Sequence, residues 1–276
     1  MSTSARLAGQ IAVVTGGALG IGGGISRRLA AAGAHVVLAD INSAAAGATR
    51  DEIVAAGGRC TVVVGDIRTP EMVTAVTEAA LAVADSRVDV LVNNVGDFRP
   101  AAKTFLHSTE EHWQALYEVN LLHVLRMCHA VLPAMVSRGR GAIVNNATVE
   151  AFRGIPYAAV YAAFNAGVVA FTRSLAVDVA QHGIRVNAIA PDLADTPQTP
   201  AELMLRGRDP DLIKTWVPMG RFGRADDYAA VVEFLASDDA RFVTGHTVPV
   251  DGGTLAASGW YARADKKGWT NLPNEA

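Results

Sequence analysis

The sequence is poor in cysteine and in aromatic residues, and it carries no large excess of charge. Its only two cysteines, Cys60 and Cys128, lie in strand-like and helix-like apolar runs and are predicted to be buried thiols rather than a disulfide or metal pair. A net charge of −3 gives no electrostatic reason to expect nucleic acid or an anionic membrane as a partner. The seven histidines show no ligand spacing such as HExxH, which argues against a metal site.

Targeting and membrane-spanning patterns are also missing from the sequence. The first ten residues lack the basic region and apolar core of a signal peptide. No stretch of 18 apolar residues is free of charges or turn formers, so no spanning helix is expected. The sequence therefore predicts a soluble, cytoplasmic protein. Its 276 residues, half of them hydrophobic, suit a single α/β domain with a full core.

The chain does contain a strand–turn–helix–strand pattern over residues 11–40. A β-branched run at 11–14 is typical of a strand buried on both faces of a parallel sheet. Glycines follow it, apolar residues then recur at helical spacing, and a second apolar run ends at Asp40. About 30 residues is the size expected of one βαβ crossover.

The glycines and Asp40 indicate a dinucleotide site. Gly16, Gly20 and Gly22 permit a tight turn and let a pyrophosphate approach the backbone, and a helix beginning near Gly20 directs its free N–H groups at that phosphate. Asp40 is placed to accept hydrogen bonds from the adenosine ribose and to repel a 2′-phosphate, which favours NAD over NADP. A plain glycine-rich turn, or a site for another adenosine cofactor such as S-adenosylmethionine, are the alternatives.

Further along the chain we expect helices at 44–56 and 70 to about 84, and strands at 61–64 and 88–92. Asp66 follows the first of these strands, at the edge of the sheet where ligands bind. Its carboxylate could accept from the adenine amino group or could serve as an N-cap or turn acid. Both interpretations remain open at this stage.

From Asn93 onward the chain resembles the short-chain dehydrogenase/reductase family. The resemblance covers about residues 7–254, with the motifs in the family's order: Thr15–Gly22 for TGxxxGxG, Asn93–Gly96 for NNAG, Asn120, Gly141–Asn145, Tyr161, Arg185–Pro191 and Val243–Gly253. It implies a doubly wound Rossmann fold, with a seven-stranded parallel sheet between two layers of helices. We therefore expect one dehydrogenase domain over residues 1–254.

The resemblance also implies which residues bind the cofactor. These are Gly16, Gly20, Ile21, Gly22, Asp40, Asp66, Ile67, Asn93, Val95, Gly96, Tyr161, Asn165, Pro191, Leu193 and Thr196. Within this set Asn93, like its neighbour Asn94, looks structural, tying adjacent strands together rather than taking part in catalysis.

Members of this family transfer a hydride between an alcohol or carbonyl group and a nicotinamide. The resemblance makes Tyr161 the proton donor or acceptor and places Thr148 where the family has a serine that binds the substrate oxygen. Threonine keeps the hydroxyl needed for that hydrogen bond. Asn120 matches the asparagine of the family's proton relay, and its alternative role is that of a polar residue that bends a helix and bonds to backbone.

Two positions depart from the family pattern. Asn165 stands where the family has a lysine that binds the nicotinamide ribose and lowers the pKa of the tyrosine. A cation within about 4–6 Å lowers an acid's pKa by ~1–3 units, so without it Tyr161 is expected to titrate near 10 and proton abstraction at neutral pH to slow by roughly ten- to a thousand-fold. The second departure is Asp192, which replaces a glycine beside the nicotinamide amide.

Two functional hypotheses follow. The first is an NAD-dependent alcohol dehydrogenase whose tyrosine is poorly activated and which works best at alkaline pH. The second is a dinucleotide-binding protein of the same fold with little or no turnover, acting as a scaffold or sensor. Retention of Tyr161, Thr148 and Asn120 together favours the enzyme.

Substrate and assembly are less strongly indicated. Residues 192–222 match the family's substrate lid, and the residues placed to meet a secondary or cyclic alcohol are Phe98, Arg99, Glu150, Phe152, Arg153, Tyr157 and Trp216. Arg99 and Arg153 suggest an acidic substrate.

The tail at 255–276 is expected to pack near the lid of its own or a neighbouring subunit. Helices at 109–136 and 158–182 form a dimer interface in relatives, implying a homodimer or homotetramer, although they could also pack only on their own sheet.

Overall fold

The computed structural model describes residues 5–84, 86–257, 259, 261–263, 265 and 269–270. One parallel sheet organises them, with the strand order β3-β2-β1-β4-β5-β6-β7. Its strands are β1 (Ile11–Thr15), β2 (His35–Asp40), β3 (Arg59–Val64), β4 (Val90–Asn93), β5 (Gly141–Asn146), β6 (Ile184–Pro191) and β7 (Thr247–Val250). The predicted doubly wound, seven-stranded parallel sheet is confirmed.

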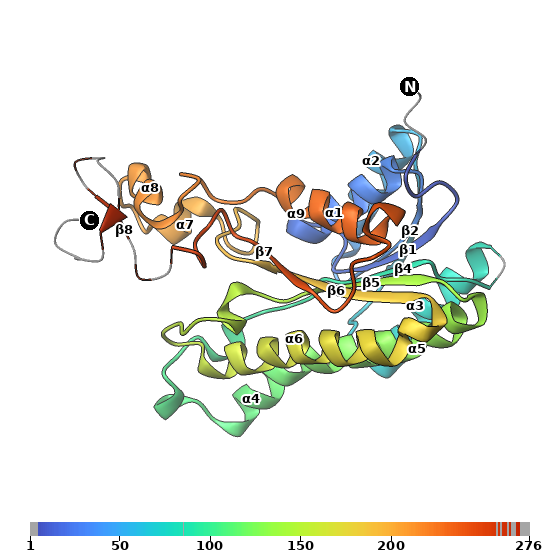
Figure 1. The fold of residues 1–276 in the computed structure, drawn as a ribbon, viewed down its shortest axis with the longest axis horizontal. Coiled ribbons are helices and arrows are strands. Elements are labelled where there is room, and N and C mark those ends of the chain that lie inside the picture. Colours follow the sequence, from blue (N-terminus) through green and yellow to red (C-terminus); the bar gives the residue numbers. More distant parts are fainter. Residues whose placement is uncertain are drawn as a thin grey trace.

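Helices cover both faces of this sheet (Figure 1). One face carries α1 (Gly20–Ala31), α2 (Ser43–Ala55) and α9 (Ala225–Ala236), and the other carries α3 (Pro70–Val83), α4 (Glu110–Tyr117), α5 (His123–Arg138) and α6 (Ala159–Val179). The alternation of strand side chains divides the core accordingly: Ile11 and Val13 join the cluster under α3, α5 and α6, whereas Ala12 and Val14 join the cluster under α1 and α9. Both faces of β1 are therefore buried.

The connections reverse direction between β1 and β4, and this reversal creates the ligand-binding edge of such a sheet. Asn94, just after β4, joins the two strand ends because its Nδ2 donates to the carbonyl oxygens of Thr15 (3.2 Å) and Gly16 (3.1 Å). Asn93 Nδ2 donates to Asn145 Oδ1 of β5 at 2.9 Å. Both asparagines tie neighbouring strands, as the sequence indicated.

The helix expected at 109–136 is interrupted. A π-helical turn, Glu118–Leu122, separates α4 from α5. The helix expected at 158–182 is α6 followed by a 3₁₀ turn, Ala180–His182. Asn120 lies inside the π turn, and the hydrogen-bonding capacity of its side chain is one reason that the regular i→i−4 pattern fails there.

Two helical stretches, Glu110–Arg138 and Ala159–His182, meet the length and mean hydropathy of a membrane span. The sequence predicts no spanning helix where an apolar run free of charges and turn formers is required, and this criterion by length and mean hydropathy is broader. Core helices of soluble proteins meet the same measure, and here α5 contacts β5 while α6 contacts β6. Their apolar character is thus partly accounted for by packing on the sheet.

The predicted lid, residues 192–222, holds α7 (Ala201–Leu205) and α8 (Ile213–Trp216) at one end of the molecule (Figure 1). Two short strands of the tail, β8 (Tyr261–Ala262) and β9 (Trp269–Thr270), pair with each other, and β8 contacts α8. The rest of the tail beyond residue 257, apart from 259, 263 and 265, lies outside the described residues. The domain boundary at 254 and the role of the tail stay predictions.

Candidate active site

The turn after β1 is shaped by backbone rather than by side chains. Gly16 and Gly20 have φ values of +61° and +54°, in the left-handed region that favours glycine. A Cβ on Gly22 would lie 1.9 Å from the carbonyl oxygen of Gly16, so no side chain fits at that position. Because α1 begins at Gly20 with no side-chain cap and no acidic residue in its first turn, its free N–H groups form a cradle suited to a pyrophosphate.

The carboxylate of Asp40 is fixed at the end of β2 beside this turn. Its Oδ2 accepts from the backbone N–H of Ala18 (3.0 Å) and its Oδ1 from that of Asn42 (2.9 Å). Each oxygen retains a lone pair for a ribose hydroxyl. No Lys or Arg occurs between Asp40 and Arg50, so this stretch of chain offers no cation to a 2′-phosphate.

Asp66 follows β3 and is held by a neighbouring cation. Its two carboxylate oxygens accept from the Arg68 guanidinium at 3.0 and 2.6 Å, and this bonding lowers the pKa of Asp66. The N-cap of α3 is Thr69, so the N-cap interpretation of Asp66 is wrong, while the turn interpretation agrees with the bonds observed. Ile67 is buried, and contacts of both residues with adenine stay predictions.

The first part of the lid crosses the edge of the sheet. Thr196 lies over the phosphate turn, since a Cβ on Gly20 would be 3.3 Å from the Cβ of Thr196. Two residues later, Gln198 Nε2 donates to the carbonyl oxygen of Gly96 at 3.3 Å. The segment thereby connects the ends of β6, β1 and β4, which brings together the groups predicted to bind the cofactor.

The remaining predicted cofactor residues make backbone bonds at the same edge. Pro191 O accepts from the Thr148 hydroxyl at 3.2 Å, Leu193 O accepts from Gly223 N at 2.9 Å, and Val95 O accepts from His123 Nε2 at 3.1 Å. Asn93 differs from the others because its side chain is fully buried among Asn145 and Cys128. Its side chain therefore has the structural role that the sequence indicated, and a contact of its backbone with the cofactor stays a prediction.

Tyr161, in the first turn of α6, lies against Thr148 and Phe98. The Phe98 ring meets the Tyr161 ring edge-on, with 6.3 Å between centroids. Burial raises the pKa of Tyr161 to about 12, the carboxylates of Glu150 and Asp97 add to the rise, and hydrogen bonding with Thr148 opposes it. The value near 10 expected from the sequence is too low, because neither the burial nor the two carboxylates could be predicted from the motif.

The side-chain amide of Asn165 is buried and bonds to the backbone of Tyr161. It is 3% exposed, and its Nδ2 donates to the carbonyl oxygen of Tyr161 one turn earlier, at 3.0 Å. Among the described residues the charged groups that act on the pKa of Tyr161 are carboxylates, not cations. The sequence predicted that Tyr161 has no cation to lower its pKa, and the charged groups that act on its pKa in the structure agree with that prediction.

Asn120 fastens the chain after β4 to the π turn. Its Nδ2 donates to the carbonyl oxygens of Asp97 and Leu116, both at 2.9 Å, and its Oδ1 accepts from Asp97 N at 3.1 Å. These are backbone bonds of the kind expected from a helix-bending asparagine. A part for Asn120 in a proton relay stays a prediction.

The two arginines predicted to receive an acidic substrate are already paired. Arg99 makes a two-point contact with Asp97 (2.9 and 2.6 Å), and Arg153 bonds Asp192 at 2.8 Å and Glu150 at 3.2 Å. Carboxylates of the same chain neutralise both guanidinium groups, which weakens the suggestion of an acidic substrate, and that suggestion stays a prediction. The sequence alone did not indicate that these two arginines pair with acidic residues of the same chain.

Of the other substrate candidates, the structure gathers Phe98 and Glu150 around Tyr161 and Thr148. Phe152, Tyr157 and Trp216 are 45%, 62% and 37% exposed, and their part in substrate binding stays a prediction.

Sequence reasoning overlooked Asp97, Thr254 and His123. The Thr254 hydroxyl donates to Asp192, although 62 residues separate them. His123 is fully buried, and burial lowers its pKa to about 4, so it is a neutral hydrogen-bond donor to Val95. No sequence pattern links these residues to the site, since each acts through a contact between distant segments. Among the described residues no group of three potential metal ligands occurs.

A backbone cradle suited to a pyrophosphate, a fixed carboxylate beside it and a half-buried tyrosine next to a buried threonine at one sheet edge are typical of a dinucleotide-binding oxidoreductase of the doubly wound class. The family model described as enoyl-(acyl carrier protein) reductase matches residues 16–254. The chain belongs to the short-chain dehydrogenase/reductase family, whose members bind a nicotinamide dinucleotide.

Several known relatives cover almost the whole chain. A 3-oxoacyl-[acyl-carrier-protein] reductase of Thermotoga maritima is 36% identical over 91% of this chain and 99% of its own. A cyclohexanol dehydrogenase of Acinetobacter is 36% identical, covering 88% and 94%. The solved structure of a putative short-chain alcohol dehydrogenase from Sinorhizobium meliloti matches with a TM-score of 0.84 at 35% identity, covering 92% of this chain and 99% of that one.

Proposed function

We propose that the protein is an NAD-dependent dehydrogenase that interconverts a secondary or cyclic alcohol and its ketone. The observation that carries this proposal is the pairing of Tyr161 with Thr148 at the sheet edge that also holds the phosphate cradle. The similarity to a cyclohexanol dehydrogenase supports an alcohol of this class.

The nicotinamide, when bound, supplies or accepts the hydride. In carbonyl reduction the Thr148 hydroxyl, which donates to Pro191 O in this structure, rotates to donate its one hydrogen bond to the substrate oxygen instead, and Tyr161 gives that oxygen its proton. The high pKa of the phenol keeps it protonated and ready for this step at neutral pH. In alcohol oxidation Tyr161 must first lose its proton, and with a pKa of about 12 only about one molecule in 10⁵ is ionised at pH 7.

NAD rather than NADP is favoured by the position of Asp40. A fixed carboxylate accepts hydrogen bonds from two ribose hydroxyls, whereas it repels a 2′-phosphate. The absence of Lys and Arg from residues 41–49 removes the cations that would compensate for that repulsion.

Asn165 supports a second candidate function, a dinucleotide-binding protein with little or no turnover. Its amide is bonded to backbone, and the phenol is surrounded by negative charge. Such a protein would bind NAD or NADH and act as a scaffold or sensor.

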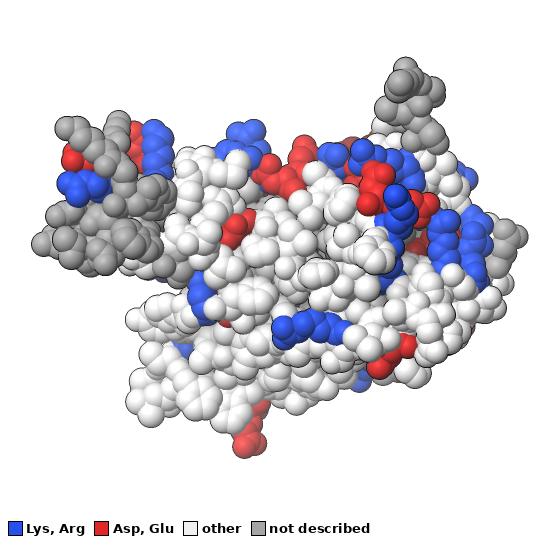
Figure 2. Space-filling model, viewed as in Figure 1, with Lys and Arg blue, Asp and Glu red and all other residues white. Residues whose placement is uncertain are grey.

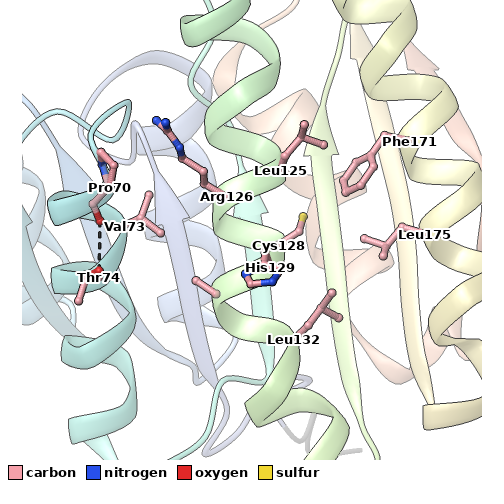
Figure 3. Close-up of a pocket in the computed structure, with 11 residues that line it drawn as sticks. Pro70, Val73, Thr74, Leu125, Arg126, Cys128, His129, Leu132, Phe171 and Leu175 are labelled. Atoms are coloured by element: carbon pink, nitrogen blue, oxygen red, sulfur yellow. Dashed lines mark hydrogen bonds between the residues drawn. The ribbon is translucent and has the colours of Figure 1, made fainter.

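Apolar helix faces support the proposal of a homodimer or homotetramer, and the location proposed for it, from the sequence, is the cytoplasm. A groove of about 660 Å³ lies between α3, α5 and α6, and Leu125, Leu132, Phe171 and Leu175 line it (Figure 3). In Figure 2 the part of the surface over α4 and α6 is largely free of charged side chains, whereas charges gather around α1, α2 and α9. A second copy of the chain would cover such a face.

The test is NADH formation from a panel of secondary and cyclic alcohols between pH 7 and 11. We expect kcat/KM to rise about tenfold per pH unit, because the tyrosinate fraction rises tenfold per unit below the pKa. Tyr161→Phe should bind NADH normally but lose turnover. If the wild type binds NADH and oxidises no alcohol at any pH, the second candidate function is correct.

A further inference from the structure

Glu150 carries a buried carboxyl group of which only one oxygen is bonded. The residue is 8% exposed. Its Oε1 accepts from the Arg153 guanidinium at 3.2 Å, while its Oε2 is buried and has no hydrogen-bond partner among the described residues. Buried polar atoms of folded proteins are nearly always bonded, so an unbonded carboxyl oxygen indicates a partner that arrives from outside the chain.

Charge in this cluster is not balanced by the fold itself. Glu150 and Asp192 share the single guanidinium of Arg153, and Asp192 receives a further hydrogen bond from Thr254. Arg153 lies closer to Asp192, at 2.8 Å, and leaves the second oxygen of Glu150 without a donor. Burial, and to a smaller extent Asp192, raise the pKa of Glu150, while Arg153 opposes the rise.

Glu150 lies next to the reacting groups. Its backbone N–H donates to the Thr148 hydroxyl oxygen at 3.4 Å, and its 3₁₀ turn, Val149–Ala151, packs against α6, which carries Tyr161. The carboxyl group is also close enough to act electrostatically on the phenol. Atoms next to a substrate oxygen held by Thr148 and Tyr161 would therefore lie near the turn that carries Glu150.

We propose that the free oxygen of Glu150 accepts a hydrogen bond from a second hydroxyl group of the substrate, so that the protein selects uncharged diols over simple alcohols. This inference rests on the proposed dehydrogenase function and names its substrate class. A hydroxyl satisfies the unbonded oxygen without adding charge. An anionic group is disfavoured, because Asp97, Glu150 and Asp192 are all acidic and the arginines beside them are already paired.

The experiment compares cyclohexanol, cyclohexane-1,2-diol and 4-hydroxycyclohexanecarboxylate with the wild type, Glu150→Gln and Glu150→Leu. We expect wild-type kcat/KM for a diol isomer to exceed that for cyclohexanol by roughly 10- to 100-fold, the usual worth of a hydrogen bond to a charged group. Glu150→Leu should bring this ratio close to one, and Glu150→Gln, which can still accept a hydrogen bond and bond Arg153, should keep part of it. The carboxylate should be the poorest substrate of the wild type.

Two controls separate this inference from the proposed function and from misfolding. NADH binding and melting temperature verify that each variant folds, and Glu78→Leu, at an exposed acid on α3 away from the site and the lid, should leave the diol-to-cyclohexanol ratio unchanged. Calorimetric dissociation constants of the diol and of cyclohexanol for the NADH complex test the preference without turnover. Equal values of kcat/KM and of affinity for the two alcohols would overturn the role of Glu150 and leave the dehydrogenase intact. A Glu150-dependent preference in affinity without turnover would support that role and overturn the dehydrogenase.

Discussion

The region proposed to bind the dinucleotide and the region proposed to transfer the proton lie at the same sheet edge, but backbone groups form most of the first and side chains form the second. The first uses backbone groups: two glycines with positive φ, the uncapped start of α1 and a carboxylate fixed by two N–H donors. The second uses side chains whose pKa values depend on their surroundings, with Tyr161 between Thr148, Glu150 and Asp97. In the first region a substitution that adds a side chain would distort the backbone, whereas in the second region a charged side chain can be replaced by an uncharged one without altering the shape of the site.

Gly22 and Asn165 illustrate this difference. A Cβ at Gly22 would collide with backbone, and backbone cannot move aside as a flexible side chain can. At Asn165 an amide is buried and bonded at the position where the family resemblance implies a lysine, and α6 continues undisturbed through it. Binding of the cofactor and transfer of the proton can therefore vary independently in this protein.

The largest effect is expected from Gly22→Ala. The new methyl group would lie 1.9 Å from the carbonyl oxygen of Gly16, so the phosphate turn must open and NADH affinity should fall by more than about 100-fold. NADH fluorescence titration measures it. The control is Gly47→Ala inside α2, where a Cβ meets nothing within 4 Å and stability should rise by about 0.5–1 kcal/mol. Unchanged NADH affinity in Gly22→Ala would show that backbone geometry does not limit this region.

Asn165→Lys should restore the missing charge. An ammonium group near the phenol lowers its pKa by ~1–3 units, so kcat/KM for alcohol oxidation at pH 7 should rise roughly ten- to a thousand-fold. The gain should shrink as the pH rises past the lowered pKa of the variant and should disappear near pH 12, where the wild type ionises as well. Asn165→Met introduces a side chain similar in length to lysine but uncharged, and it should show no gain in kcat/KM in the same pH series. A gain of equal size at every pH would contradict an effect on the pKa of Tyr161.

Asp40→Asn tests the charge within the backbone-built region. The amide keeps one acceptor oxygen but no longer repels a 2′-phosphate, so the ratio of kcat/KM for NAD to that for NADP should fall by about 10-fold. Asp66→Asn is the matched control, because Asp66 also follows a strand but is paired with Arg68. If Asp66→Asn changed the ratio as much as Asp40→Asn, the choice of dinucleotide would not be a property of Asp40.

The two regions also differ in how far the sequence predicts them. Gly16, Gly20, Gly22 and Asp40 could be placed because their roles depend on neighbours within one βαβ unit. The pairing of Arg153 with Asp192 could not, because it joins segments 39 residues apart that meet only when β5 and β6 align. The pKa of Tyr161 was underestimated for the same reason, since burial and carboxylates from other loops determine it.

Thr148→Ser should have the smallest effect, a change in kcat/KM of less than about threefold. Both residues present one hydroxyl, and the bond to Pro191 O requires only that hydroxyl, so the loss of a methyl group should alter fit rather than chemistry. Thr148→Val, which keeps the shape and removes the hydroxyl, should lower kcat/KM about 100-fold or more, because the substrate oxygen loses its donor. Steady-state kinetics of the two variants with one alcohol measures both changes. Equal losses in Thr148→Ser and Thr148→Val would mean that shape, rather than the hydroxyl, is what position 148 contributes, and the contrast between a backbone-built and a side-chain-built region would fail there.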